Sequence, residues 1–216
     1  MWVASLELDD WAVLEREIIN CRKCRLHAGR RNAVPGEGNR KALVVFIGEA
    51  PGEREDEMGR PFVGAAGQLL TQLIESIGYR REDFYITNVV KCRPPGNRDP
   101  EDDEIEACLP YLIKQLELIK PRVIVTLGRL AGRVIFRLAG LKWISMTANH
   151  GKVYEATLLG SKVKIVPTYH PASALYRPPL RATIEEDFKN VIKPTIDEEM
   201  GLKPKKPGKT LFDYLQ

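Results

Sequence analysis

The sequence predicts a single α/β domain, a three-layer α/β/α sandwich built around a mostly parallel, doubly wound sheet of about four strands. One observation is the alternation of short apolar runs with longer segments whose apolar residues recur at helical spacing. A second is residues 43–47, Leu-Val-Val-Phe-Ile, a continuous apolar run typical of a strand buried on both faces of a parallel sheet. The length of 216 residues suits one sizeable domain and would make two cramped.

The first half of the chain contains the elements that open this alternation. Residues 5–20 carry apolar side chains at helical spacing, and the polar, glycine-rich residues 25–41 are typical of a loop. The strand at 43–47 runs into Gly48-Glu-Ala-Pro-Gly52, where the glycines allow a tight turn and the proline stops the strand. The elements expected next are a loop at 53–63, a helix at about 65–77 that Gly78 ends, and a strand at 84–90.

The second half continues the same pattern. Residues 92–100 must be irregular, because three prolines and a glycine cannot continue regular structure. Pro100 and the acids after it start a helix that runs to about Lys120, since the helix dipole favours negative charge in the first turn. The elements expected next are a strand at 123–127, a helix at 128–138, a hairpin at 152–158 and 163–167, and a helix at about 181–192.

The composition is that of a soluble globular protein, with 44% apolar and 29% charged residues. No stretch reaches the apolar length of a membrane span, and the amino terminus lacks the layout of a secretory signal. We therefore expect a cytoplasmic protein that has no membrane partner. The formal charge of +4 falls short of a strong nucleic-acid signature, although cations do cluster, for example within residues 22–25.

The four cysteines suggest a metal centre. Structural disulfides are rare in a reducing cytosol, and Cys21-x-x-Cys24 is a chelating pair. Fifteen residues separate Cys92 from Cys108, so these two do not form a second chelating pair, and a zinc ribbon fits poorly. Four thiolates gathered from three places suit a cubane iron–sulfur cluster or a structural zinc, and four unrelated buried thiols are the remaining alternative.

Three polar side chains lie where strands of the predicted sheet end. Glu49 comes directly after the first strand, Asn88 lies at the end of the second, and the last strand leads into His170. In open α/β sheets the carboxyl ends of the strands form the edge at which ligands bind, so these side chains are candidates for one site. Each also has an ordinary interpretation, since an asparagine can cap a turn and a histidine can hydrogen-bond near the surface.

Four short motifs together resemble the family 4 uracil-DNA glycosylases, the iron–sulfur branch found in bacteria and archaea. They are Gly48-Glu-Ala-Pro-Gly52, Gly59-Arg-Pro-Phe62, Thr87-Asn-Val-Val-Lys-Cys-Arg-Pro-Pro-Gly-Asn-Arg98 and His170-Pro-Ala-Ser173. The similarity extends from about Cys21 to Asn190 and includes all four cysteines. The related family 5 enzymes carry an apolar residue where this chain has Glu49, which favours family 4.

The resemblance implies a base-excision repair enzyme that flips uracil out of DNA and hydrolyses its bond to deoxyribose. Phe62 would stack on the base, and the Asn88 amide would match N3–H and O4 of uracil but mismatch cytosine. His170 would hydrogen-bond the uracil O2 as negative charge develops, while Glu49 would stabilise the sugar cation or orient the attacking water. The family also implies that Glu55 would exclude the thymine methyl, and that the backbones of Glu49, Gly52 and Gly128 would line the pocket or a phosphate site.

The resemblance also assigns the DNA contacts and the cofactor. Residues 172–177 would be a loop that enters the duplex, with Leu175 or Tyr176 filling the vacated space and Arg177 meeting a phosphate. No lysine occupies a family position for an amine nucleophile, so we expect a monofunctional enzyme that leaves an abasic site. The family's cofactor is a [4Fe–4S] cluster bound by Cys21, Cys24, Cys92 and Cys108, with zinc the lesser alternative.

We expect a monomeric protein whose carboxyl-terminal segment is separate from its folded domain. We place the glycosylase-like domain at residues 1–196, and a basic linker with a short tail at 197–216. Residues 208–215 resemble the sliding-clamp-binding peptides of archaeal replication and repair proteins, with Leu211, Tyr214 and Leu215 at the apolar positions. Gly208 replaces the usual glutamine of such peptides, and a tail that packs on its own domain is the alternative.

Three functions from different classes remain open on the sequence alone. The first is uracil excision from DNA, and the second is a non-catalytic iron–sulfur protein that binds DNA or senses redox state. The third is a glycosylase of the same fold that acts mainly on another deaminated base, such as hypoxanthine or xanthine. Asn88 and Phe62 favour uracil, because their chemistry matches the edge and the face of that base.

Overall fold

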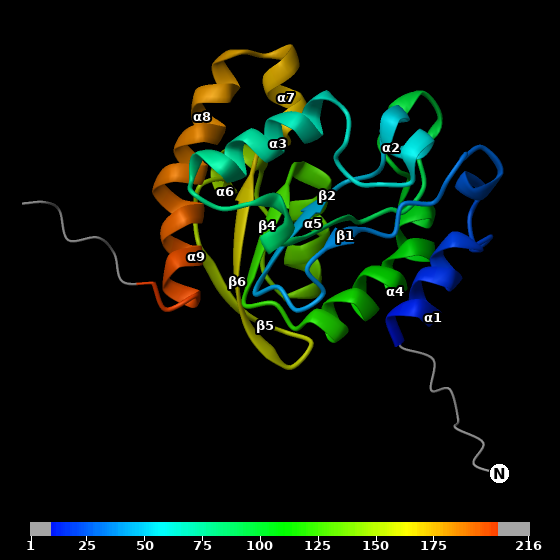
Figure 1. Cartoon of the computed structure of the whole chain (residues 1–216), viewed down its shortest axis with the longest axis horizontal. Coiled ribbons are helices and arrows are strands. Elements are labelled where there is room, and N and C mark those ends of the chain that lie inside the picture. The colour runs from blue at the N-terminus through cyan, green and yellow to red at the C-terminus, as the bar shows by residue number, and fades with distance from the viewer. Residues whose placement is uncertain (1–9, 203–216) are drawn as a thin grey trace, which may run out of the picture.

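The computed structural model describes residues 10–202 and places one twisted sheet at the centre of the molecule (Figure 1). Within these residues the sheet has six strands in the order β1-β3-β2-β4-β6-β5. Their bounds are β1 Glu37–Gly38, β2 Val44–Gly48, β3 Tyr85–Asn88, β4 Val123–Leu127, β5 Tyr154–Leu158 and β6 Ser161–Thr168. The four central strands are parallel, while β1 and β5 pair antiparallel at the two edges. The mostly parallel sheet is confirmed, and β1 is too short to have left a pattern in the sequence.

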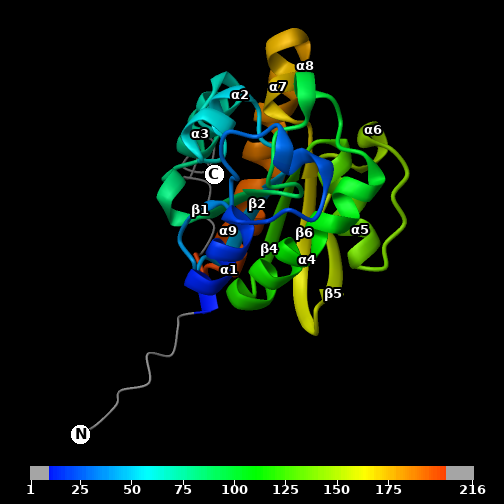
Figure 2. The same cartoon turned by 90° about the vertical axis from the view of Figure 1, so that its right-hand side faces the viewer.

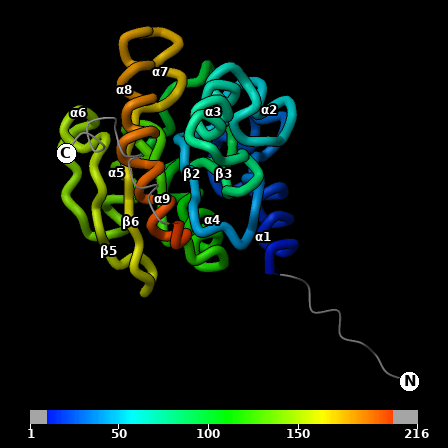
Figure 3. Tube along the Cα trace, turned by 60° about the vertical axis from the view of Figure 1, so that its left-hand side comes forward, coloured from blue at the N-terminus to red at the C-terminus, as the bar shows by residue number. Residues whose placement is uncertain are grey.

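Helices cover both faces of the sheet and complete the three layers. The bounds are α1 Asp10–Ile19, α2 Glu53–Met58, α3 Ala65–Ser76, α4 Asp102–Ile119, α5 Arg129–Leu138, α6 Met146–Asn149, α7 Pro171–Tyr176, α8 Pro179–Asp187 and α9 Lys193–Glu199. One core cluster joins the sheet to α1, α4 and α5, which Figure 2 shows side by side. The other joins it to α3, α8 and α9, the helices that Figure 3 brings forward.

Strand β2 lies at the middle of the core, as its apolar run predicts. Val45 and Ile47 belong to the cluster under α1, α4 and α5, whereas Val44 and Phe46 belong to the cluster on the opposite face. All four side chains are fully buried. Each such side chain stabilises the fold by about 1.5–3 kcal/mol relative to leaving it exposed, so β2 is anchored from both sides.

The register of the parallel strands aligns their carboxyl ends along one edge of the sheet. Gly48 at the end of β2 lies opposite Asn88 at the end of β3, and Leu127 at the end of β4 lies opposite Thr168 at the end of β6. The residues that follow these strands are therefore brought together. This edge is where the expected site residues lie.

Two segments expected to be loops are short helices. Residues 53–63 contain α2, which begins after Gly52 with acids in its first turn and ends at Gly59, whose φ of 68° is left-handed. Residues 172–177, expected to be a loop, belong largely to α7, which begins at Pro171 after the N-cap residue His170. A six-residue helix is too short to show a hydrophobic period, which is why the sequence pattern missed both.

The last helical segment is longer than residues 181–192. It begins with α8 at Pro179, passes through a π-helical turn at Phe188–Ile192, and ends with α9 at Glu199. The expected domain boundary after residue 196 therefore falls inside α9. Leu211, Tyr214 and Leu215 of the expected clamp-binding tail lie outside the described residues. No helix within residues 10–202 has the length and apolar character needed to cross a bilayer.

Candidate active site and cysteine cluster

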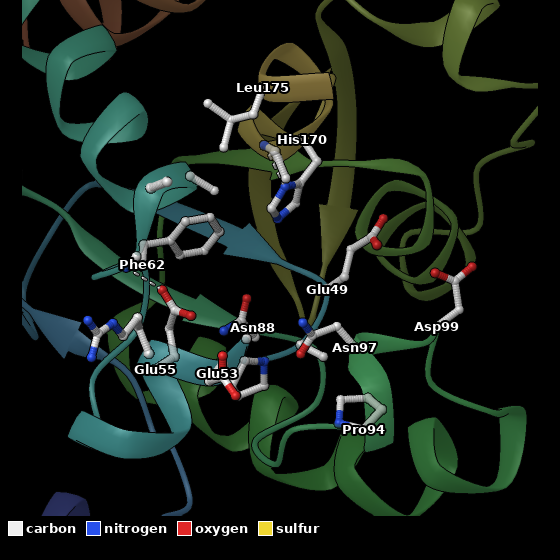
Figure 4. Close-up of a pocket in the computed structure, with 18 of the residues that line it drawn as sticks. Glu49, Glu53, Glu55, Phe62, Asn88, Pro94, Asn97, Asp99, His170 and Leu175 are labelled. Carbon is white, nitrogen blue, oxygen red and sulfur yellow. Dashed lines mark hydrogen bonds between the residues drawn. The ribbon is translucent and has the colours of Figure 1, made fainter. Parts of the chain in front are cut away.

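A cavity of about 520 Å³ opens at the carboxyl edge of the sheet (Figure 4). Its walls come from the ends of β2, β3 and β6, from α2 and α7, and from the irregular loop after β3. The expected site residues that line it are Glu49, Gly52, Glu55, Phe62, Asn88, His170, Leu175 and Tyr176. The volume is in the range of ligand-binding cavities, and the three strand-end side chains share it as predicted.

Glu49 is held by the start of the neighbouring helix α5. Its Oε1 accepts a hydrogen bond of 2.9 Å from the backbone N–H of Leu130. Burial raises the pKa of this carboxyl, and the Leu130 hydrogen bond opposes that rise. Gly128 makes the arrangement possible, because a Cβ there would lie 2.4 Å from Glu49 Oε1 and its φ is +99°.

Asn88 presents an unpaired acceptor at the cavity. The residue is 2% exposed, and its Oδ1 has no hydrogen-bond partner. Gly48, directly opposite on β2, provides the room for it, since a Cβ at Gly48 would lie 2.4 Å from Asn88 Oδ1 and 2.5 Å from Phe62 Cζ. A buried carbonyl without a donor is uncommon in folded proteins, so this oxygen points to a ligand that supplies an N–H.

His170 is a neutral ring that can donate one hydrogen bond. The backbone N–H of Ala172 donates to its Nδ1 at 3.1 Å, which leaves the proton of a neutral ring on Nε2. Burial lowers the pKa of His170 to about 4, so the ring is uncharged at neutral pH. Nε2–H is thus the donor that His170 can offer to a ligand.

Phe62 and Glu55 form the wall that faces His170. The Phe62 and His170 rings are near-parallel, with centroids 5.5 Å apart. Phe62 holds a left-handed φ of 51°, and the Arg81 guanidinium donates to its carbonyl at 3.0 Å. Glu55 Oε1 accepts from the backbone N–H groups of Val63 and Gly64, both at 2.8 Å. A left-handed conformation is strained for a non-glycine residue. The hydrogen bonds on this stretch of backbone hold Phe62 in that conformation and thereby set the direction of its ring.

The residues assigned to DNA contact lie at the rim. Leu175 and Tyr176 on α7 are 48% and 85% exposed, which is unusual for large apolar side chains beside a cavity. Arg177 and Gly128 line a second cavity of about 500 Å³, which shares Glu49 and His170 with the first. The expected positions are therefore close together, although Arg177 does not reach the first cavity.

Sequence reasoning missed the contribution of the loop after β3. Asn97 and Asp99 line the first cavity, and Asp99 pairs with Arg129 at 2.6 Å. The pattern marked residues 92–100 only as irregular. The signal that could have found them is position, because a loop that follows Asn88 must pass over the edge at which Asn88 lies.

The four cysteines converge near the amino end of the domain. All four are free thiols that line one small cavity between α1, α4 and the end of β3. Three sulfurs accept N–H hydrogen bonds: Cys92 from the Arg30 side chain at 2.9 Å, Cys108 from the backbone of Lys91 at 3.2 Å, and Cys21 from the backbone of Lys23 at 3.5 Å. Such donors stabilise thiolates, and charged or dipolar neighbours of this kind surround iron–sulfur ligands.

The four cysteines share a cavity but do not form a compact single-ion site. Within residues 10–202 no three His, Cys, Asp or Glu side chains converge closely enough to hold a single metal ion. Four cysteine thiols that line one cavity are a donor set that fits a [4Fe–4S] cluster.

The chain is similar to known uracil-DNA glycosylases over most of its length. Residues 35–193 match the family model described as the uracil DNA glycosylase superfamily. The chain is 56% identical over 208 residues to the type-4 uracil-DNA glycosylase of Archaeoglobus fulgidus, covering 96% of this chain and 98% of that protein. It is 54% identical over 185 residues to the type-4 uracil-DNA glycosylase of Saccharolobus solfataricus, covering 85% and 86%. It is 28% identical over 186 residues to the type-5 uracil-DNA glycosylase of Pyrobaculum aerophilum, covering 72% and 79%.

Proposed function

The chain belongs to the uracil DNA glycosylase superfamily, and on that premise we propose that it is a type-4 enzyme that removes uracil from DNA. It is a DNA-repair N-glycosyl hydrolase that flips uracil out of the strand, hydrolyses the bond to deoxyribose and leaves an abasic site. The observation that carries this function is the buried, unpaired Oδ1 of Asn88 in the cavity between Phe62 and His170.

Asn88 selects the base by its hydrogen-bonding edge. Leaving a buried acceptor unpaired costs about 1–3 kcal/mol, so a ligand that donates an N–H there is favoured. Uracil carries a proton on N3 and an acceptor at O4, which the Asn88 carbonyl and amino groups match. Cytosine presents an unprotonated N3 to the same oxygen, so two acceptors would face each other and binding is disfavoured.

His170 and Glu49 act on opposite partners of the breaking bond. The bond between C1′ and N1 breaks with its electron pair leaving on uracil, and His170 Nε2–H donates to O2 as the anion forms. The Glu49 carboxylate stabilises the positive charge on the sugar and takes the proton of the water that adds to C1′. Removing a donor such as His170 lowers the rate by about two to three powers of ten.

Phe62 and Glu55 complete the pocket. Phe62 offers its ring face to the flipped base, and its fixed backbone limits how far the ring moves. Glu55 holds the N–H groups of Val63 and Gly64 and closes the pocket where a thymine methyl would lie. The backbone of Gly52 lies against Glu55, where a Cβ would come within 2.8 Å of Oε2. Together these residues restrict the pocket to a small flat ring.

DNA approaches across α7 in this proposal. The exposed Leu175 and Tyr176 fill the space that the flipped nucleotide leaves, and Arg177 meets a phosphate of the same strand. Lys91 is the lysine nearest in sequence to Asn88, yet its ammonium is buried and does not line the cavity. An amine nucleophile is therefore absent from the described cavity walls, which supports a monofunctional enzyme.

Cys21, Cys24, Cys92 and Cys108 hold a [4Fe–4S] cluster in this proposal, supported by their shared cavity and N–H donors. When bound, the group cross-links the end of α1 to β3 and α4 and takes no part in bond cleavage. We expect the purified protein to be brown and to contain iron, and metal analysis that finds zinc without iron would overturn this.

We place the catalytic domain up to the end of α9 and assign the segment after it to partner binding. Leu211, Tyr214 and Leu215 would bind a sliding clamp, while the enzyme works as a cytoplasmic monomer. A pull-down with the clamp tests this, using a Tyr214→Ala chain as the matched control.

A gel assay on defined oligonucleotides tests the main function. Single-stranded and duplex substrates carry uracil, hypoxanthine or only normal bases, and alkali reveals the abasic sites. We expect cleavage at uracil by the wild-type enzyme and severe loss in Asn88→Ala and His170→Ala proteins that keep the wild-type melting temperature. Cleavage mainly at hypoxanthine, or binding without cleavage, would contradict the proposal.

A further inference from the structure

Lys91 is a fully buried amine whose three hydrogen-bond partners are uncharged oxygens. The side chain is 1% exposed, and its Nζ is hydrogen-bonded to Thr87 Oγ1 at 2.6 Å, to Asn88 O at 2.7 Å and to Gln115 Oε1 at 2.7 Å. Burying an amine is costly unless its hydrogen bonds with water are replaced, so this set of acceptors explains how Lys91 is accommodated.

The acceptors of Lys91 belong to a fully bonded polar network under the uracil pocket. Gln115 Nε2 donates to Pro35 O at 2.8 Å and to Tyr85 OH at 3.1 Å, and Thr87 Oγ1 donates to the same Pro35 O at 2.8 Å. Thr87, Asn88 and Gln115 are each 2% exposed or less. A satisfied buried network of this kind permits few alternative arrangements of the atoms it joins.

The backbone of Lys91 connects this network to the cysteines. Its N–H donates to Cys108 Sγ at 3.2 Å, its carbonyl accepts from Val34 N at 2.8 Å, and the next residue is Cys92. One residue therefore contacts a cysteine sulfur through its main chain and the Asn88 carbonyl through its side chain.

The Oδ1 of Asn88, which would accept a hydrogen bond from the base, depends on contacts that fix the Asn88 backbone. Because Asn88 Oδ1 has no hydrogen bond of its own, nothing on that atom holds it in the orientation that a base requires. Its position depends on the peptide between residues 88 and 89, whose N–H donates to Gly48 O at 2.9 Å and whose carbonyl accepts from Lys91. A small tilt of this peptide would swing the amide away from the base.

We propose that Lys91 is a positioning residue for uracil recognition, fixing the peptide of Asn88 from beneath the pocket and coupling it to the cysteine cluster. The inference rests on the proposed function of Asn88. Lys91 does not line the cavity, so it acts only through Asn88 and touches neither base nor sugar. Losing it should impair base binding specifically, while DNA binding is preserved.

The test compares two affinities in the iron-loaded, full-length enzyme. Free uracil is titrated calorimetrically, and a duplex oligonucleotide with a tetrahydrofuran abasic site is titrated by fluorescence anisotropy. We expect Lys91→Met to weaken free uracil binding by about tenfold, because a buried carbonyl loses its donor. Affinity for the abasic duplex should stay within about twofold, because that ligand lacks the base.

Three further variants distinguish positioning from general stability. Ile196→Ala creates a cavity in the core cluster on the opposite face of the sheet, so it should lower the melting temperature and leave uracil affinity unchanged. Gln115→Leu removes an acceptor of Lys91 and should weaken uracil binding, whereas Gln115→Glu keeps that acceptor and should restore it. The two Gln115 variants still test the inference if the Lys91→Met protein does not fold.

Two results would overturn the inference. One is wild-type uracil affinity in both Lys91→Met and Gln115→Leu, and the other is an equal loss of uracil and abasic-duplex affinity in these variants. The second result would give Lys91 a purely structural role. A wild-type enzyme that neither binds uracil nor releases it from DNA would instead contradict the proposed function, so the two failures are distinguishable.

Discussion

Gly48→Ala should damage catalysis although it adds only one methyl group. The Cβ would lie 2.4 Å from Asn88 Oδ1 and 2.5 Å from Phe62 Cζ, whereas ordinary contact begins at 3.4 Å. The recognition amide and the stacking ring must therefore move by roughly 1 Å, since β2 is pinned on both faces and cannot retreat. The backbone at residue 48 is an ordinary strand, so the methyl group alone is responsible.

Two quantities follow from this crowding. Overpacking of this size destabilises the fold by about 1–3 kcal/mol. A displacement of about 1 Å at a catalytic group lowers the rate by about 100-fold. We therefore expect kcat/KM on a uracil-containing oligonucleotide to fall by about two powers of ten at a temperature where the variant is still folded.

Gly29→Ala is the matched control for this experiment. Gly29 has an ordinary φ of −106°, and nothing lies within 4 Å of a Cβ built there. The same substitution at this position should leave both activity and stability close to wild type. A Gly48→Ala enzyme with wild-type kcat/KM would refute the reasoning, because the pocket could then absorb the methyl without displacing either side chain.

Three further predictions concern the acid, the rim and the cysteines. Excision falls as the pH drops through the Glu49 pKa, which burial raises above 4.5, and Glu49→Gln removes this acid limb from the pH profile of kcat/KM. His170 is neutral above its pKa of about 4, so a second limb near pH 7 would count against its assignment. Tyr176→Ala lowers excision from duplex DNA by about tenfold and spares single-stranded DNA, which parallel gel assays check. Arg30→Gln removes the donor to Cys92 Sγ and lowers the cluster's reduction potential, measured by voltammetry, and an unchanged potential would contradict this role.

The strand-end residues could be predicted because their placement follows from topology alone. Parallel strands in a doubly wound sheet bring their carboxyl ends to one edge, so Glu49, Asn88 and His170 were expected at the same edge once the strands were found. The motifs added Phe62 and Glu55, which lie off the strands and line the same cavity. How close the strand-end residues lie depends on the order β3-β2-β4-β6, which the sequence pattern did not determine.

The supporting contacts could not be predicted, because they depend on side chains that meet across large sequence separations. Nothing in the sequence around Lys91 indicates that its ammonium lies under Asn88, or that Gln115 on α4 is its acceptor. Helix α7 was missed because it has only six residues, yet it supplies the N–H that fixes the His170 tautomer. Local pattern identifies the reacting groups, and packing determines how they are held.

Burial disfavours the charged forms of both Glu49 and His170. It raises the pKa of Glu49 and lowers that of His170, and both side chains pack against Gly128. If His170 carried a proton on both nitrogens, its charge would pair with the Glu49 carboxylate and weaken that carboxylate's attraction for the sugar cation. In the proposed mechanism a neutral imidazole still donates from Nε2 to the uracil anion, because the N–H of Ala172 donates to Nδ1. The Glu49 carboxylate would then act on the sugar while His170 gives the base a hydrogen bond without a competing ion pair.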